Sequence, residues 1–431
     1  MAMNLPGHLS YDSVVQLLEG RIGLYHGWHP AVMSWLLGLG DAVWRGTSLF
    51  VLLDASLLFG AMLSLIWAVP KVSWFALPVA LGCVLLPQFQ LYQAIVWKDV
   101  LFANAAVAGF IALAHAAARW PVPRLRTILL AISWGFLSLS ALSRQNGVIL
   151  LPFAAFAMAW IARRHGASIV HAFTSAGGTL VLSCAAIAVV SLALSARTVG
   201  YSAPSRQMRL LEFYDLNGAL AADPKLALPE LQRSQPKLLG LMRHDGRRLY
   251  SPARSDYLAL WMLRTPLAGT SSVSLHNAWG QFIAANPGLY VRDRAQIFRW
   301  LLFPRDIRAC VPYVIGVDGP SFAMRVLGLR ARYSEHDEWM DDYAGMFVGT
   351  PVFSHVPFLL IGGAALAFLL IRRRDADLAF ASMLCSVALF TLSFFVISIA
   401  CDYRYLYVVD VSALIAIFYI ALDPRLEHRV A

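Results

Sequence analysis

Ionisable side chains stand beside long apolar runs at three places in this 431-residue sequence. They are Asp12 and His29 near the amino terminus, the stretch Trp97-Lys98-Asp99, and Arg144 together with Asp402-Tyr403-Arg404-Tyr405. Charged groups at membrane depth are costly and tend to mark functional sites. A carboxylate can take a proton from a reacting hydroxyl, while cations stabilise an anionic leaving group such as phosphate. One carboxylate and several cations at one membrane face would suit that chemistry.

These charged residues also have a structural interpretation, and the sequence leaves both open. Asp12 can cap a short helix, and Lys98 with Asp99 can anchor and cap a membrane helix at the interface. Arg144 and Arg404 can extend toward the interface or pair with carboxylates. In that case the charges would stabilise the fold without taking part in a reaction.

The sequence does not support a metal site. His26 and His29 are three residues apart, but no acidic third ligand lies near them. The five cysteines form no CxxC pair and show no regular spacing, so they indicate neither a zinc site nor a disulfide framework. We expect no cofactor, because these residues do not support a divalent metal.

Long apolar runs separate the charged residues and would hold them in place as helices. The chain is 59% hydrophobic and 14% charged, whereas soluble domains hold about 45–50% apolar and about 25% charged residues. We therefore predict an all-α membrane protein with about nine transmembrane helices. Asp54 lies inside the first of them, where it could line a polar cavity or, as we favour, play a structural role by bonding a neighbouring helix. The runs lie at roughly 47–69, 73–90, 99–118, 126–142, 145–162, 173–195, 350–371, 377–400 and 404–422.

Basic residues indicate the orientation of these runs. The net charge is +10, and basic residues fall in short clusters between the runs, a pattern that does not indicate a nucleic-acid surface. With nine spans, every cluster falls on one side: Lys71; Arg119, Arg124 and Arg126; Arg163 and Arg164; Arg372 to Arg374; and Arg425 and Arg429. The positive-inside rule makes that side cytoplasmic. We expect a multi-pass protein of the inner (plasma) membrane.

This topology divides the chain into five parts. They are an extracytoplasmic first loop with an amphipathic helix (1–46), transmembrane helices 1 to 6 (47–195), an extracytoplasmic segment (196–349), transmembrane helices 7 to 9 (350–422) and a cytoplasmic tail (423–431). This topology puts the amino terminus on the outer face with no helix before it, which leaves two alternatives. Either the short tail crosses the membrane by itself or, as we favour, the true start lies upstream and one helix is missing.

The 196–349 segment is long enough for a compact domain. Helices are expected over 204–222, 276–286 and 290–303, with a loop over 223–256. Cys310 and Cys401 are the two cysteines predicted on the oxidising side. A bridge requires Cα atoms within about 7 Å. Two cysteines in one compartment need not be neighbours, so paired and unpaired states both remain open.

The chain resembles the GT-C superfamily of membrane glycosyltransferases, of the bacterial protein O-mannosyltransferase or lipid A aminoarabinose transferase type. These enzymes use polyprenyl-phosphate sugars as donors. The resemblance covers most of the chain through short motifs. The motifs are an aspartate in a PG-x-x-S-x-DS setting followed by an HP dipeptide, Trp97-Lys98-Asp99, Ser143-Arg144-Gln145-Asn146-Gly147, the run Trp279, Ile283, Asn286-Pro287, Tyr290, Arg294, and Asp402-Tyr403-Arg404-Tyr405.

Two features depart from that family. Its first transmembrane helix, which precedes the aspartate loop, is absent here. The acidic pair found in many relatives is also absent, because Asp12 is followed by Ser13.

The resemblance implies an inverting glycosyltransferase that acts at the outer face of the inner membrane with Asp12 as the catalytic base. The acceptor would be an envelope glycan, lipid or protein. The expected phosphate-binding residues are Lys98, Arg144 and Arg404, with His29, Asp99, Asp402 and Tyr403 in supporting positions. Two alternatives remain. One is a transporter or flippase of lipid-linked sugars, which would be expected to carry inverted repeats. The other is a scaffold, or a polysaccharide polymerase or ligase that does not use this base.

Overall fold

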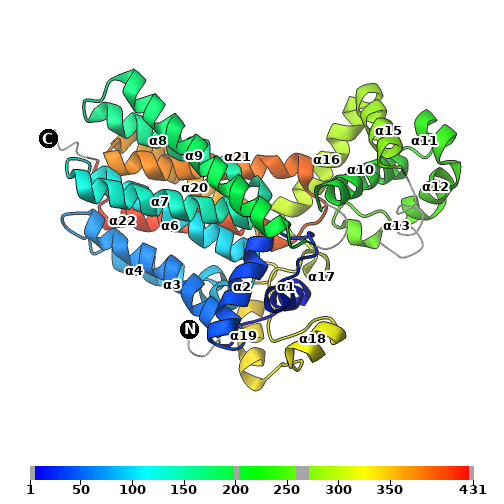
Figure 1. The fold of residues 1–431 in the computed structure, drawn as a ribbon, viewed down its shortest axis with the longest axis horizontal. Coiled ribbons are helices and arrows are strands. Elements are labelled where there is room, and N and C mark those ends of the chain that lie inside the picture. Colours follow the sequence, from blue (N-terminus) through cyan, green and yellow to red (C-terminus); the bar gives the residue numbers. More distant parts are fainter. Residues whose placement is uncertain (1–4, 199–202, 259–270, 427–431) are drawn as a thin grey trace. The chain divides into compact units, whose positions relative to one another are not determined.

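The computed structural model describes residues 5–198, 203–258 and 271–426, and this part of the chain is built from helices joined by turns (Figure 1). Extended segments within it meet only at isolated bridges. The chain divides into two compact units. Unit 1 comprises Met1–Val199, Tyr313–Thr391 and Arg404–Ala431, and unit 2 comprises Gly200–Pro312 and Leu392–Tyr403.

Eight helical segments in the described residues are long and apolar enough to cross a membrane. The shortest has 18 residues and the longest 27, which suits a hydrocarbon layer about 30 Å thick at about 1.5 Å per residue. The chain is therefore an all-α, multi-pass membrane protein. The segments are Ser48–Ala68 (α3 with a 3-10 turn), Lys98–Ala118 (α6), Pro123–Ser143 (α7), Gln145–Arg164 (a 3-10 turn with α8), Ile169–Ser195 (α9), His355–Arg372 (α20), Asp375–Ile397 (α21) and Tyr403–Leu422 (a 3-10 turn with α22).

The expected run at 73–90 differs from the other eight. It forms the nine-residue helix α4 (Ala76–Val84) and the single turn α5 (Pro87–Gln90). Pro87 causes the break, because a proline disfavours helical geometry in the residue before it, and Leu86 is extended. The segment still traverses unit 1 antiparallel to α22. The Ser73 backbone nitrogen donates to the Leu422 carbonyl at 2.9 Å, and the Gln93 amide donates to the Tyr407 hydroxyl at 2.6 Å.

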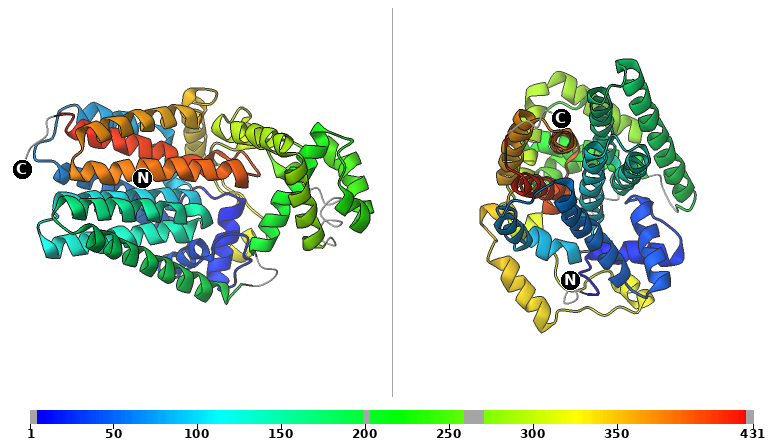
Figure 2. Two further views of the ribbon diagram at one scale, coloured as in Figure 1. Left: turned by 90° about the horizontal axis from the view of Figure 1, so that it is seen from above. Right: turned by 90° about the vertical axis from the view of Figure 1, so that its left-hand side faces the viewer.

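Helix α6 lies at the centre of the unit 1 bundle, against α3, α7 and α22 (Figures 1 and 2). It is buried along its span, because its many alanines let neighbouring helices approach closely. The Asn104 amide donates to the Asp54 carboxylate of α3 at 3.0 Å and to the Gln93 side chain at 2.8 Å. Asp54 therefore bonds a neighbouring helix, and α6 presents Lys98 and Asp99 at one end of the bundle.

Short helices pack at that same end. They are α1 (Tyr11–Ile22), α2 (Ala31–Val43), α18 (Ser321–Leu327) and α19 (Glu335–Gly345). Helices α1 and α2 touch backbone to backbone at Gly20 and Gly38, where a Cβ on Gly20 would lie 2.0 Å from the Ser34 carbonyl oxygen. The Val96 backbone nitrogen donates a hydrogen bond to the His8 carbonyl at 3.1 Å. This contact ties the chain before α1 to the chain before α6.

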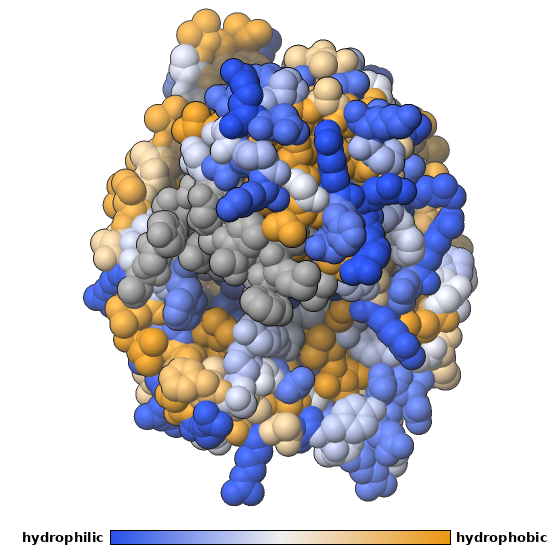
Figure 3. Space-filling model, turned by 90° about the vertical axis from the view of Figure 1, so that its right-hand side faces the viewer, coloured by the Kyte–Doolittle hydropathy of each residue, from blue (hydrophilic) through white to orange (hydrophobic). Residues whose placement is uncertain are grey.

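Unit 2 has its own apolar core between α10 (Ala203–Ala222), α15 (Ser272–Ala285) and α16 (Pro287–Leu302). These three helices match the expected ones closely, and Asn286-Pro287 forms the predicted break. The expected loop at 223–256 instead contains the short helices α11 (Pro229–Ser234), α12 (Pro236–Leu241) and α13 (Arg247–Leu249). Hydrophilic side chains are numerous on the face shown in Figure 3, where these short helices lie.

A disulfide joins Cys310 to Cys401 within unit 2, with their Cα atoms 4.8 Å apart. Cys310 ends the short helix α17 (Ile307–Cys310), and both cysteines are buried with Ala253 and Ala309. Of the two states left open by the sequence, paired and unpaired cysteines, the structure therefore contains the paired one. A disulfide is stable in an oxidising compartment and rare in the cytosol.

Candidate active site

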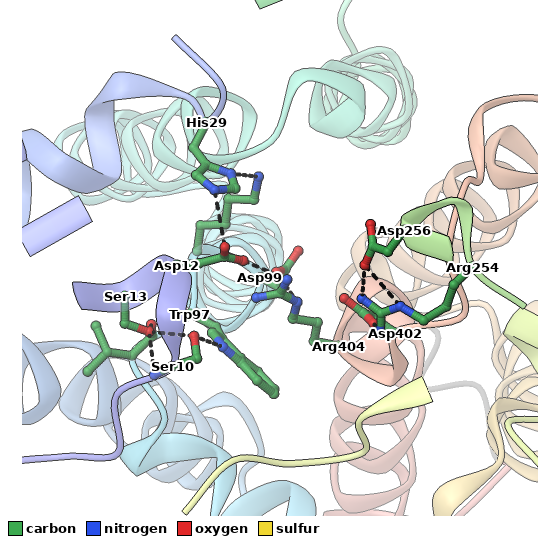
Figure 4. Close-up of polar contacts among 12 residues, drawn as sticks. Ser10, Asp12, Ser13, His29, Trp97, Asp99, Arg254, Asp256, Asp402 and Arg404 are labelled. Atoms are coloured by element: carbon green, nitrogen blue, oxygen red, sulfur yellow. Dashed lines mark hydrogen bonds and ion pairs between the residues drawn. The ribbon is translucent and has the colours of Figure 1, made fainter. Parts of the chain in front are cut away.

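Asp12 lies in the first turn of α1 and keeps 29% of its side chain exposed. Its Oδ2 accepts a hydrogen bond of 2.7 Å from Nη2 of Arg404, which belongs to the 3-10 turn (Tyr403–Leu406) before α22. Its Oδ1 lies 3.6 Å from Nε2 of His29, an ion-pair distance that is longer than a hydrogen bond. Figure 4 shows His29 and Arg404 on opposite sides of this carboxylate. Residues 392 positions apart thus meet at one carboxyl group.

Lys98 reaches Asp12 through His29. The Lys98 Nζ lies 3.0 Å from His29 Nδ1. An ammonium group has only donors, so Nδ1 must accept this bond and the ring proton sits on Nε2, the nitrogen that faces Asp12. Pro30 follows His29 and is the N-cap residue of α2, while Lys98 is the first residue of α6. The amino-terminal ends of α1, α2 and α6 therefore hold Asp12, His29 and Lys98 in position.

Asp99 pairs with the two arginines of the site. Its side chain is 1% exposed and accepts a hydrogen bond from Arg144 Nη1, while Arg404 Nε lies 3.8 Å from its Oδ2. Arg144 also donates to the Tyr405 carbonyl at 3.2 Å. The structure thus brings Arg144 into the cluster through Asp99, and Asp99 supports both cations.

Trp97 and two serines fix α1 against the start of α6. The Trp97 Nε1 donates to Ser10 Oγ at 3.0 Å, and Ser13 Oγ donates to the Val96 carbonyl at 2.6 Å (Figure 4). The Arg404 guanidinium carbon lies 5.0 Å from the centre of the Trp97 ring, a separation at which a cation and an aromatic face attract each other. Trp97 was named from the sequence as part of the stretch Trp97-Lys98-Asp99, but its contacts with Ser10 and Arg404 were not predicted.

Asp402 and Tyr403 belong to unit 2, where Asp402 accepts a hydrogen bond of 2.9 Å from Arg254 Nη1. Arg254 also pairs with Asp256, and Tyr403 is fully buried. The supporting role expected for these two residues stays a prediction.

The two histidines of the first loop have different partners. His26 Nδ1 lies 3.0 Å from Glu19 Oε1, whereas His29 contacts Asp12 and Lys98. Among the described residues, no group of three or more His, Cys, Asp or Glu side chains is placed to hold a metal ion.

Electrostatics set the charge state of the central pair. Partial burial alone would raise the pKa of Asp12, but the interactions with His29 and the positive charge of Arg404 outweigh it and hold that pKa well below its usual range. Burial, followed by the charge of Lys98, lowers the pKa of His29 below its ordinary 6.5, although Asp12 pulls in the opposite direction. Asp12 is therefore an anion and His29 is neutral at pH 7.

No protein-family model, curated protein sequence or solved structure matches this chain. The geometry of the cluster itself indicates its chemistry. A partly exposed carboxylate, flanked by a neutral imidazole and by guanidinium and ammonium groups, can accept a proton next to a bound anion.

Proposed function

We propose that this protein is a membrane glycosyltransferase that moves a sugar from a polyprenyl-phosphate donor to an envelope acceptor at the outer face of the inner membrane, with inversion. The observation that carries the proposal is the exposed edge of Asp12, set between Arg404 at 2.7 Å and the His29–Lys98 pair. The proposed base, Asp12, therefore lies next to the cations proposed to bind phosphate, an arrangement that transfer from a phosphate ester requires.

The proposed reaction proceeds in one displacement. An acceptor hydroxyl oxygen attacks the anomeric carbon of the sugar while Asp12 takes the hydroxyl proton. The bond from the anomeric carbon to the phosphate oxygen breaks, and polyprenyl phosphate leaves with the electron pair. Arg404 and Lys98 stabilise its negative charge, so the leaving group needs no proton. Attack from the face opposite the phosphate inverts the anomeric configuration.

Arg404 links donor binding to the strength of the base. While it pairs with Asp12, it lowers the pKa of the carboxyl group and makes the aspartate a poor proton acceptor. A donor phosphate competes for the same guanidinium, which can hold phosphate in bidentate fashion. Binding of the donor would release Asp12 and raise its basicity. Asp99 stays beside Arg404 and keeps the guanidinium in place.

An apolar groove in unit 1 supports a lipid-linked donor. It has a volume of about 330 Å³ and lies between α2, α3, α6 and α7. Leu101, which lines the groove, follows Lys98 by about one helical turn. A hydrocarbon chain in this groove would therefore begin close to the cations that hold its phosphate. The other lining residues are Leu36, Leu39, Gly40, Val43, Leu49, Phe50, Leu53, Asp54, Leu57 and Leu139.

Donor binding and sugar transfer, measured separately in nanodiscs, test the proposal. A polyprenyl phosphate carrying a radiolabelled sugar serves as donor, with cell-envelope extract as acceptor. Lys98→Ala and Arg404→Ala should weaken donor binding as well as turnover, because both cations face the phosphate in the ground state and in the transition state. Arg45→Ala is the control, since its side chain is 76% exposed and pairs with Asp41.

Two results would contradict the proposal. One is full donor binding and turnover in both cation variants. The other is movement of intact lipid-linked sugar across the bilayer without covalent transfer, which would favour a flippase. Covalent transfer with retention of configuration would leave a glycosyltransferase but exclude the single displacement.

A further inference from the structure

A cavity in unit 1 lies at the opposite end of the bundle from Asp12. Its volume is about 490 Å³. Its walls include Ala117 and Ala118 at the end of α6, the helix that begins with Lys98. Nothing in the proposed sugar transfer uses this cavity.

The cavity has an excess of positive charge. Four arginines and two aspartates line it, so four positive and two negative charges leave an excess of two. The arginines are Arg164, Arg373, Arg374 and Arg425, the aspartates are Asp375 and Asp423, and His165 adds a further nitrogen ligand.

Ion pairs hold most of these side chains in place. Arg374 Nη1 donates to Asp423 at 2.7 Å, and Arg425 Nε donates to the same carboxylate at 2.8 Å. Arg164 and His165 share Asp375, at 3.2 and 2.9 Å. These four basic groups from three segments are thus fixed around one space, as a preorganised anion site requires.

Arg373 is one of the exposed members of the set. Its Nε donates to the Leu370 carbonyl at 2.9 Å, and its backbone adopts φ +59°, a left-handed conformation that is uncommon for residues other than glycine. The residue ends α20 and turns the chain sharply toward α21. It adds a guanidinium to a cavity whose other arginines already face carboxylates.

Most of the remaining wall is apolar. Its residues are Ala68, Val69, Pro70, Ala117, Ala118, Pro121 and Ala376, and Tyr419 lines the cavity as well. The cavity therefore has a cationic part and an apolar part, and both lie where membrane helices end. A helix of about 20 residues spans the hydrocarbon layer, so its ends reach the depth of lipid headgroups. A small soluble anion would gain nothing from the apolar wall, whereas a phospholipid has a phosphate and a glycerol backbone that fit both parts.

We propose that this cavity binds the phosphate headgroup of an anionic phospholipid. The arginines contact the phosphate, the apolar wall contacts the glycerol and the start of the acyl chains, and the net positive lining selects a net negative lipid over a zwitterionic one. Basic pockets between helix ends on the cytoplasmic side of a membrane commonly hold such headgroups.

Native mass spectrometry of the full-length protein tests this site. The protein is released from detergent micelles that contain equal amounts of dioleoyl phosphatidylglycerol and dioleoyl phosphatidylcholine, and the retained lipids are counted. The wild type should retain one phosphatidylglycerol in preference to phosphatidylcholine. Arg373→Gln should reduce that preference about fivefold and Arg164→Gln/Arg373→Gln about 25-fold, because each basic residue contributes roughly a factor of five.

The control is Arg163→Gln. Arg163 precedes Arg164 on the same helix, but it donates to the Ala167 carbonyl and does not line the cavity. Equal loss of preference in this control and in Arg373→Gln would overturn the proposal, because the effect would then be one of general surface charge. Because Arg373 is exposed, its single variant should fold, and an unchanged melting temperature verifies this.

A competition arm separates lipid from free phosphate. Inorganic phosphate at a concentration a thousandfold above that of the lipid should leave phosphatidylglycerol bound, because it cannot use the apolar wall. Displacement of the lipid by inorganic phosphate alone would overturn the phospholipid assignment and identify a soluble-anion site. Sugar transfer plays no part in this measurement, so its outcome is independent of the role of Asp12.

Discussion

Removing the disulfide between Cys310 and Cys401 should strongly destabilise unit 2. The bridge joins residues 91 positions apart. The chain-entropy relation for a closed loop of that length gives about 4.6 kcal/mol at 25 °C, as an upper value for a bridge without native strain. That is a large part of the free energy of unfolding of an ordinary domain, which is about 5–15 kcal/mol. A melting transition for unit 2 should fall by roughly 10–20 °C.

Limited proteolysis across a temperature series measures this effect on the purified protein in nanodiscs. Dithiothreitol treatment and Cys310→Ala/Cys401→Ala should shift the transition in the same direction, and the alanine variant should shift somewhat further because it also leaves a small cavity. Cys184→Ala is the control, since Cys184 is a free thiol in α9. Two maleimide-reactive thiols at Cys310 and Cys401 in the unreduced, unfolded protein would refute the bridge itself.

Three further outcomes follow from other parts of the structure. Arg294→Met should destabilise unit 2 by about 3–5 kcal/mol in denaturant titrations, because it leaves a carboxylate buried without its partner, whereas the exposed Arg233→Gln should change stability by less than about 1 kcal/mol. Gly20→Ala should lower the yield of folded protein in gel filtration, because a Cβ there would lie 2.0 Å from a carbonyl oxygen of α2. Protonation of His29 should reduce sugar transfer only below pH 6.5, because the pKa of His29 is lowered from that value. Lys98→Met removes a positive charge that opposes protonation, so the acid limb of the pH–rate profile should move to higher pH, and an unmoved limb would contradict the contact.

The membrane class and most of the helix bounds could be predicted from the sequence, because a membrane helix must satisfy its own backbone within one apolar run. The run at 73–90 shows the limit of this reasoning. Its composition is apolar enough, but Pro87 breaks the helix, and contacts with α22 hold the broken segment in the bundle. Hydropathy alone does not report such tertiary support.

The residues of the candidate site could be named from the sequence, but the pairs that they form could be predicted only in part. Asp12, Lys98, Arg144 and Arg404 could be named because charges beside apolar runs are rare. Their pairing depends on packing between distant segments, and here Arg144 pairs with Asp99.

Arg404 and Asp402 form ion pairs with different residues. Asp402 was expected as a supporting residue because it belongs to the Asp402-Tyr403-Arg404-Tyr405 motif; in the structure Asp402 pairs with Arg254, and Arg404 pairs with Asp12. Side chains one or two positions apart in a helical turn do not face each other. Sequence proximity therefore did not indicate a shared partner.

Single-turnover sugar transfer by Asp12→Asn tests the central claim most directly. Asparagine keeps the shape of the side chain but removes its basicity, so donor binding should persist while the transfer rate falls by about 10²–10⁴-fold. Thermal melting and donor binding, measured on the same preparation, verify that the variant is folded. A transfer rate within a few-fold of the wild type, with donor binding intact, would contradict the account and remove Asp12 from the mechanism.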